Sequence, residues 1–427
     1  MKKLMSAVLA ASFTLSAAAH DMVPGEPQQQ PVLLQGGTLY TITDGIQPQT
    51  DLLFENGVIT AIGKNIELPE NTRVINIDGR HVYPGLIAMD TTLGLVEIGA
   101  VRATDDQEEV GSITPEVSGH TAYNPDSEVI PTVRFNGITH AQIVPQGDLI
   151  RGRSSLLQTD GWTFEDAAEV LDMGVHLSWP RVGLNTAWWE RRSPEEQRKA
   201  NAEALKKLHQ AFTDAQAYYV AKLAGESQGT DVRWEAMTGL FDGSSKLYIH
   251  AQDKRQIEQA LDFSREYGFD LVLMGARDAW RLAAELAAAE VDVVYGAPYG
   301  LPTRHDEAYD QAYATPAILA QAGVNFAISY PGYWDIRNLA FAAGNAVAYG
   351  LDQQQALAAI TIKPAQIMGV DDKIGSLEVG KQASLIVSGG DVMNHLSQDI
   401  ELMFIDGSAV DLNNRHNQLY QKYRQKP

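Results

Sequence analysis

The chain has 427 residues, 44% hydrophobic and 20% charged, a balance that excludes a disordered or collagen-like protein. Its 33 Lys and Arg face 54 Asp and Glu, giving a formal net charge of −21, which excludes a general nucleic-acid binder because such a surface repels a polyanion. The sequence has no cysteine, which excludes disulfides, thiolate metal ligands, cysteine nucleophiles and a lipid-anchored N-terminal cysteine.

The first twenty residues have the pattern of a cleaved signal peptide. Lys2 and Lys3 precede an apolar stretch that ends in the small residues Ser16 to Ala19. The stretch is too short for a membrane anchor, which needs roughly 18 apolar residues. We therefore predict a signal peptide at 1–19, a flexible lead-in at 20–31, no later membrane span, and a periplasmic or secreted protein that is not a lipoprotein.

The next fifty residues predict short β-strands. Segments such as Val58–Ile62 and Arg73–Ile77 are rich in β-branched residues, and turns such as Asn56-Gly57 and Asp78-Gly79 separate them. We expect a small strand-rich module here.

From Tyr83 onward, strands alternate with helices. A helix is expected after Ser193-Pro194-Glu195-Glu196, which has the pattern of a capping box with proline at the first helical position. Such alternation predicts a parallel sheet, and seven strands between residues 83 and 330 favour a closed (β/α)8 barrel. The eighth strand is expected between Arg181 and Ser245, near Val232–Trp234, unless the barrel is distorted. The seven expected strands are Tyr83–Thr92, Gly137–Pro145, Val175–Trp179, Lys246–His250, Asp270–Gly275, Val291–Tyr295 and Asn325–Tyr330.

Strand patterns return near the C-terminus, at Ala383–Val387 and Ile400–Ile405. The β segments at the two ends of the chain could complete one sheet. The expected domains are a composite β-sandwich at 32–82 and 365–412, a barrel at 83–364 and a tail at 413–427.

Chemistry in a barrel belongs at the C-terminal ends of its strands. Asp90 and His250 end two of the expected strands, and each is a candidate for acid–base catalysis or for holding a metal; turn capping and a structural rim position are the alternatives. Among the other histidines, His140 and His176 are expected to be packing residues far from the mouth. The expected substrate-binding residues are aromatic residues at strand ends and two arginines in a loop after the second strand: Trp179, Tyr295, Tyr330, Arg151 and Arg153.

Three motifs give the chain a family resemblance. Val82-Tyr83-Pro84-Gly85-Leu86-Ile87, the segment 356–369, and the segment 375–387 with its Gly-Ser-Leu-Glu-Val-Gly-Lys turn resemble the amidohydrolase superfamily, in particular its imidazolonepropionase-like and exported dipeptidase-like members. The resemblance covers nearly all of the expected mature chain. It implies a distorted TIM barrel beside a composite β-sandwich, and hydrolysis of carbon–nitrogen bonds by metal-activated water.

Most of the family's metal ligands are replaced. Where the family has His-x-His, this chain has Asp90-Thr91-Thr92; a later family histidine falls on Met274 or Gly275, and the last aspartate on Ser329 or Tyr330. Only His250 matches. A thioether and a glycine are poor substitutes for imidazoles, so we expect no binuclear centre and at most one divalent, zinc-like ion on Asp90 and His250.

Two functions remain open at this stage. The first is an exported hydrolase of amide, cyclic amide or peptide-like bonds with a reduced or absent metal site. The second is a silent homologue that binds a small molecule or partners another protein. A small-molecule substrate or ligand is expected in both cases. The protein could act alone, as a homo-oligomer, or paired with a related amidohydrolase.

Overall fold

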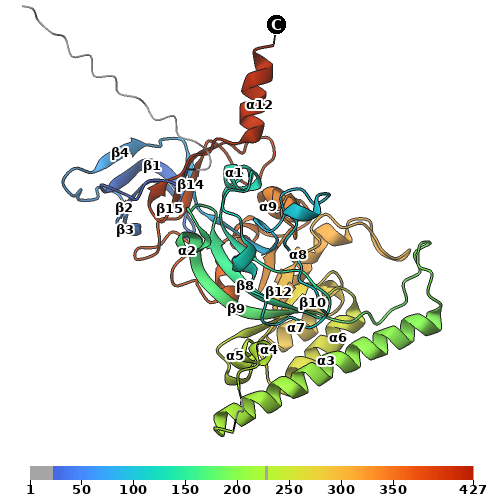
Figure 1. The fold of residues 1–427 in the computed structure, drawn as a ribbon. Helices are drawn as coiled ribbons and strands as arrows, with labels where there is room; N and C mark the ends of the chain where they lie inside the picture. The colour runs from blue at the N-terminus through green and yellow to red at the C-terminus, as the bar shows by residue number, and fades with distance from the viewer. Residues whose placement is uncertain (1–22, 227–228, 427) are drawn as a thin grey trace, which may run out of the picture.

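A computed structural model describes residues 23–226 and 229–426 (Figure 1). Its framework is two eight-stranded sheets, one curled into a barrel and the other beside it. The expected signal peptide, 1–19, and the first residues of the expected lead-in lie outside the described residues.

The barrel sheet keeps its strands in chain order, and its two edges nearly meet. The Ser329 hydroxyl donates to the Met89 carbonyl at 2.7 Å, and Thr91 forms an isolated parallel bridge with Gly332. These contacts confirm the predicted α/β fold with a distorted TIM barrel. The strands are β6 (Leu86–Thr91), β7 (Ile138–Ile143), β8 (Ile150–Gln158), β9 (Ala168–Ser178), β10 (Lys246–Ala251), β11 (Leu271–Gly275), β12 (Asp292–Tyr295) and β13 (Phe326–Ile328).

The distortion comes from β8, which runs antiparallel to both of its neighbours, β7 and β9. It is the eighth strand, so the position predicted for that strand was wrong: Val232–Glu235 forms the short helix α4. An antiparallel neighbour needs only a short turn, whereas a parallel one needs a crossover of a dozen or more residues. The expectation of strict strand–helix alternation therefore missed it.

Helices cover the outside of the barrel (Figure 1). The start of α3 is as predicted, because Ser193 Oγ accepts the Glu196 N–H at 3.2 Å and Glu196 Oε2 accepts the Ser193 N–H at 2.6 Å. Most of the helices pack through small and apolar residues. They are α1 (Val129–Phe135), α2 (Phe164–Ala167), α3 (Pro194–Leu223), α4 (Val232–Glu235), α5 (Thr238–Asp242), α6 (Lys254–Tyr267), α7 (Ala283–Ala288), α8 (Gln311–Ala322), α9 (Leu339–Ala348), α10 (Gln353–Ala358), α11 (Ile362–Met368) and α12 (Arg415–Arg424).

The second sheet takes strands from both ends of the described chain, as the fold prediction required. At the junction, β5 and β14 pair antiparallel, with Tyr83 opposite Ile386. The exact domain boundaries expected from the sequence stay predictions. The strands are β1 (Val32–Tyr40), β2 (Ile46–Glu55), β3 (Val58–Gly63), β4 (Arg73–Asn76), β5 (His81–Pro84), β14 (Leu385–Ser388), β15 (Ile400–Ile405) and β16 (Ser408–Ala409).

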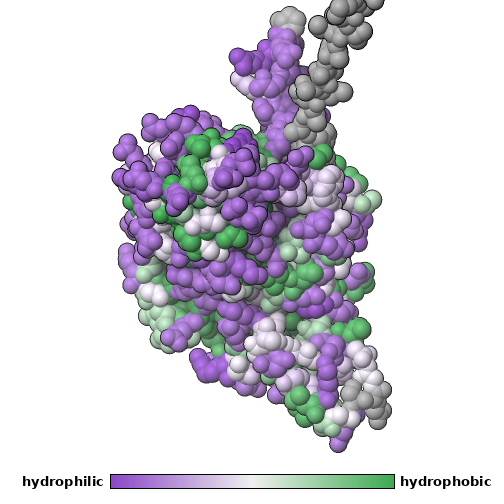
Figure 2. All heavy atoms as spheres, turned by 90° about the vertical axis from the view of Figure 1, so that its left-hand side faces the viewer, coloured by the Kyte–Doolittle hydropathy of each residue, from purple (hydrophilic) through white to green (hydrophobic). Residues whose placement is uncertain are grey.

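Hydrophilic side chains cover most of the face seen in Figure 2, with apolar residues in small patches. Within the described residues, no helix combines the length and the hydropathy that crossing a bilayer requires. Helix α12 stands away from the body in Figure 1 and buries none of its residues.

Candidate active site

Inside the barrel, polar side chains from β6, β8, β9 and β10 meet at one cluster. It contains Asp90, Arg151, Ser154, His176 and His250, all buried except the half-buried Arg151. Asp90 and His250 are brought together, with Asp90 Oδ2 3.9 Å from His250 Nδ1. Three of the strands, β8, β9 and β10, are neighbours in the sheet, and β6 is separated from β8 by β7.

Asp90 occupies an unusual backbone position. Its φ is +56°, and the register between β6 and β7 shifts between Ala88 and Thr91. A non-glycine residue in this region costs of order 1–3 kcal/mol, and such strain is concentrated at functional sites. Burial raises the pKa of the Asp90 carboxyl to about 6, and the nearby Arg151 opposes that rise. The carboxyl therefore changes charge near neutral pH.

The hydrogen bonds of His250 define its tautomer. Its Nε2 lies 3.0 Å from His176 Nδ1 and 3.4 Å from Arg151 Nη1. Because a guanidinium can only donate, the arrangement assigns His250 Nε2 as the acceptor and places its proton on Nδ1, toward Asp90. Burial first, then Arg151, holds the pKa of both imidazoles well below its ordinary value, so both are neutral.

The cluster continues as a chain of hydrogen bonds. His176 Nε2 lies 2.8 Å from Ser154 Oγ, Gln142 Nε2 donates to Ser154 Oγ at 3.1 Å, and the Asp90 N–H donates to Gln142 Oε1 at 3.3 Å. The His176 ring also stacks on Tyr248 with 4.5 Å between centroids. These contacts fix the rings of His176 and His250 and hold the backbone at Asp90.

His176 joins the cluster although the sequence did not predict it there. It was expected to be a packing residue at the start of a strand, but β9 begins at Ala168 and His176 lies near its C-terminal end. The signal was available in its spacing: His176 and Ser178 are two residues apart, so both point to one face of β9.

The two arginines lie on β8, and the prediction of a loop was wrong. Arg151 enters the cluster, where its Nε donates to Ser178 Oγ at 2.8 Å. Arg153 pairs instead with Asp172 Oδ2 at 2.8 Å and donates to Ser118 Oγ at 2.9 Å. Residues two apart on a regular strand share a face, but the register of the β8–β9 pairing shifts between Ile150 and Gly152, and the two guanidinium groups contact different partners.

The aromatic candidates are placed differently from the expectation. Trp179 donates its indole N–H to Gln259 Oε1 at 3.0 Å, and the Tyr295 hydroxyl donates to the Ala312 carbonyl at 2.8 Å. Both are buried against the helical layer, so neither lines a cleft as predicted. Tyr330 remains half-buried, with its ring centroid 5.1 Å from that of Tyr299.

The donor set does not fit a metal ion of the kind that the family resemblance implies. His250 Nε2 is already an acceptor, and the Arg151 cation lies 3.4 Å from it, where it would repel a second cation. Asp90 is the nearest carboxylate, and none of the described residues form a group of three or more metal-binding side chains. A catalytic zinc normally takes three protein ligands.

Comparison with protein families places one part of the chain. A model described as "Amidohydrolase family" matches residues 271–410, which run from β11 to β16. Amidohydrolase tasK of Hapsidospora irregularis is 22% identical over 84% of this chain, and the chain spans only 39% of that protein's length. A dihydroorotase of Syntrophus aciditrophicus is 34% identical over 87 residues, which are 19% of this chain and 20% of the relative.

Solved structures match over most of the chain. An amidohydrolase from Thermotoga maritima is 26% identical, with a TM-score of 0.76 over 89% of this chain and 99% of its own. A prolidase bound to N-methylphosphonate-L-proline is 14% identical, with a TM-score of 0.55 over 90% and 100% of the two chains. At that identity, the second likeness shows the fold alone.

Proposed function

Since the chain belongs to the amidohydrolase superfamily, we propose that it is a hydrolase of carbon–nitrogen bonds in amide, cyclic amide or peptide-like compounds. The likeness to the Thermotoga maritima amidohydrolase covers nearly the whole of both chains and supports this class of reaction. The Hapsidospora irregularis relative is much longer than this chain, so the proposal does not include the activity of that whole protein.

One observation carries the proposal: a buried carboxyl with a pKa of about 6 lies beside a neutral imidazole and an arginine in the barrel. A general base works best when its pKa lies near the operating pH. Among the described residues, Arg151 Nη2 has no hydrogen-bond partner, while Nε and Nη1 are used. It is therefore free to donate to a substrate oxygen.

The proposed reaction uses only these side chains. Ionised Asp90 takes a proton from water as the water oxygen forms a bond to the carbonyl carbon, and Arg151 Nη2 stabilises the oxyanion. The carbon–nitrogen bond then breaks, and protonated Asp90 gives its proton to the leaving nitrogen. The His250 Nδ1–H, 3.9 Å from the carboxylate, favours its ionised form through the dipole of the ring N–H.

Kinetics of two variants test the proposal. Asp90→Ala and His250→Ala should each lower kcat/KM by at least about 100-fold, because the first removes the general base and the second removes the imidazole beside it. In the wild type, kcat/KM should rise as the pH increases through about 6, where Asp90 ionises. Asp148→Asn, an exposed residue near β8, is the charge-matched control for the Asp90 change and should keep full activity. Unchanged rates in both alanine variants would refute the assignment.

A second function is favoured by the replaced ligands and by the burial of the site. Asp90 and His250 side chains are only 7% exposed, and the donor set does not fit a metal. A barrel without hydrolysis would keep a small-molecule pocket, alone, in a homo-oligomer, or as partner to an active relative. Ligand binding without turnover across a screen of amides and dipeptides would select this function over the first.

We further propose that the protein is exported, on the strength of the basic, apolar and small-residue segments at 1–19. N-terminal sequencing of protein recovered from the periplasm or medium should then start at His20. A chain that retains Met1 and stays in the cytoplasm would contradict export.

A further inference from the structure

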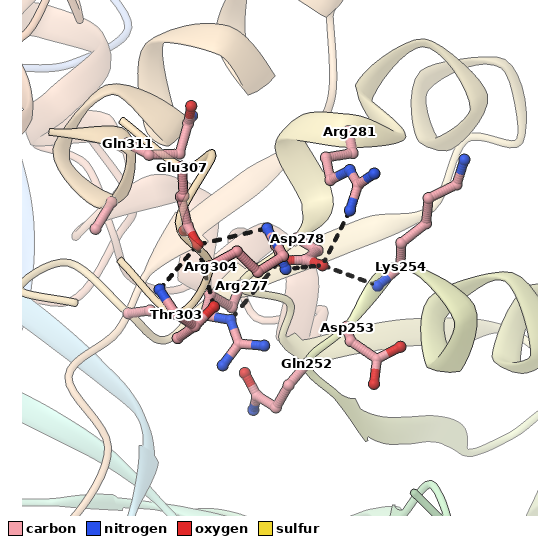
Figure 3. A network of polar contacts seen from close by, with 12 residues as sticks. Gln252, Asp253, Lys254, Arg277, Asp278, Arg281, Thr303, Arg304, Glu307 and Gln311 are labelled. Atoms are coloured by element: carbon pink, nitrogen blue, oxygen red, sulfur yellow. Dashed lines mark hydrogen bonds and ion pairs between the residues drawn. The ribbon is translucent and has the colours of Figure 1, made fainter. Parts of the chain in front are cut away.

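A second polar network lies at the same end of the barrel, beyond β10 and β11 (Figure 3). Its centre is Asp278, whose side chain is 1% exposed. Asp278 accepts two parallel hydrogen bonds from Arg304, at 2.9 and 3.0 Å, and one from the Lys254 N–H at 3.2 Å. Arg281 lies farther away, at 3.9 Å. All three of these hydrogen bonds come from partners other than Arg277, which makes only an ion pair with Asp278.

The backbone holds this network against the barrel rim. The Ala276 N–H donates to the Ala251 carbonyl at 2.9 Å, and the Asp278 N–H donates to the Gln252 carbonyl at 3.0 Å. Gly275 has a φ of +78°, and a Cβ there would lie 2.1 Å from Gln252 Nε2. The turn after β11 is therefore tied to β10, with the Gln252 side chain packed over Gly275.

Arg277 is the member of the network with an unused hydrogen-bond donor. Its Nε lies 3.7 Å from Asp278 Oδ1, too far for a hydrogen bond, and this buried nitrogen has no hydrogen-bond partner among the described residues. The side chain is 30% exposed, so a ligand can reach it. In Figure 3, the Arg277 guanidinium and the Gln252 amide lie on the same side of the network, away from the Asp278 carboxylate.

The position of Arg277 relates it to the candidate active site. His250 and Met274 are paired in the sheet, and Gln252 and Arg277 follow these two residues. All four thus lie along the C-terminal ends of adjacent strands, the end at which barrel loops bind substrates.

We propose that Arg277, assisted by Gln252, binds a carboxylate group of the substrate. A guanidinium with unused N–H donors suits two parallel hydrogen bonds to a carboxylate. On a chain with a formal net charge of −21, such a local cation is also needed to hold an anion. This inference rests on the proposed hydrolase function, which makes the bound molecule a substrate. It narrows the proposed substrates to amides that carry a carboxylate, such as N-acyl amino acids.

Equilibrium binding tests the subsite without relying on turnover. Isothermal titration of the full mature protein with N-acetylglycine should give binding that Arg277→Gln weakens at least tenfold and Arg277→Lys weakens less. N-acetylglycinamide, which lacks the carboxylate, should bind equally to all of these proteins. Arg281→Gln is the matched control, since it removes the same charge from the same network at a side chain 40% exposed. It should stay within twofold of the wild type.

Two results overturn the subsite: wild-type protein that does not prefer the carboxylate probe, or Arg277→Gln and Arg277→Lys variants that both bind it as the wild type does. Thermal unfolding of each variant checks that it is folded. If Arg277→Gln disrupts the turn, the comparison of Arg277→Lys with the wild type tests the subsite.

Kinetics separate this subsite from the hydrolase function. Arg277→Gln should raise KM at least tenfold more for an N-acyl amino acid than for the matching neutral amide. If Asp90→Ala keeps full activity while Arg277→Gln loses anion binding, the catalytic assignment fails and the subsite stands. If Asp90→Ala is inactive while Arg277→Gln binds normally, the reverse holds.

Discussion

At the scale of single residues, the site depends on which face of a strand each side chain occupies. Arg151 and Arg153 are two residues apart, but a register shift in the β8–β9 pairing lies between Ile150 and Gly152. Arg151 accordingly reaches His250 in the barrel, whereas Arg153 pairs with Asp172. Such an irregularity determines which side chain enters the cluster, and here it is Arg151 whose guanidinium lies next to His250 Nε2.

The buried carboxyl of Asp90 makes a stability prediction with a definite sign. Its pKa is raised from 3.8 to about 6, so ionisation costs the folded state about 3 kcal/mol above pH 6 and nothing below pH 3.8. Asp90→Asn cannot ionise. It should therefore be more stable than the wild type at pH 8 by up to that amount, and the advantage should shrink as the pH falls from 6 toward 4.

Urea unfolding of both proteins at pH 8 and pH 4.5 measures this difference. Asp148→Asn removes the same charge from an exposed position and should show no comparable pH-dependent gain. An Asp90→Asn variant with the same advantage at both pH values would contradict the assigned pKa.

At the scale of elements, local sequence signals predicted helix α3 well. The Ser193–Glu196 capping box was visible in the sequence, because both of its hydrogen bonds join residues three apart. Strand β8 was missed, because its antiparallel direction depends on the partners at its two edges and on a short turn after β7. The residues after the second expected strand, Arg151 and Arg153 among them, were expected to form a loop instead.

The cap of α3 offers a test at this scale. Ser193→Ala removes the acceptor for the Glu196 N–H and should cost about 1 kcal/mol of helix stability. Hydrogen exchange of the first-turn amides, Glu195 to Gln197, should accelerate, while exchange near Phe212 should not. Ser193→Asp keeps an acceptor and is the control, which should retain slow exchange. Equal protection in the alanine variant would show that the cap does not hold this end.

At the scale of the whole molecule, two strands join the two cores. Along β14, Leu385 and Val387 face the core of the second sheet, whereas Ile386 faces the barrel-side core; along β5, Val82 and Tyr83 divide in the same way. Period-two alternation therefore places one strand between two hydrophobic clusters. Loss of packing on either face should weaken both.

Alanine substitutions on the two faces of β14 test this coupling. Leu385→Ala and Ile386→Ala should each cost about 2–5 kcal/mol, since both side chains are fully buried. In scanning calorimetry, both should shift the same unfolding transition. Val379→Ala, at a side chain 62% exposed, should leave it unchanged. Two separate transitions, each moved by only one of the substitutions, would show that the cores unfold independently.

The amino-acid sequence by itself determined the fold class, the strand-rich segments at the two ends, the α3 cap and the candidacy of Asp90 and His250. These follow from alternation, spacing and motifs within short segments. Tertiary structure decided the rest. It brings His176 and Arg151, which lie 74 and 99 residues before His250, to the same nitrogen of His250. It also makes β8 the eighth strand and turns Trp179 and Tyr295 toward the helices. Contacts across such separations depend on strand order, direction and register, which no local pattern encodes.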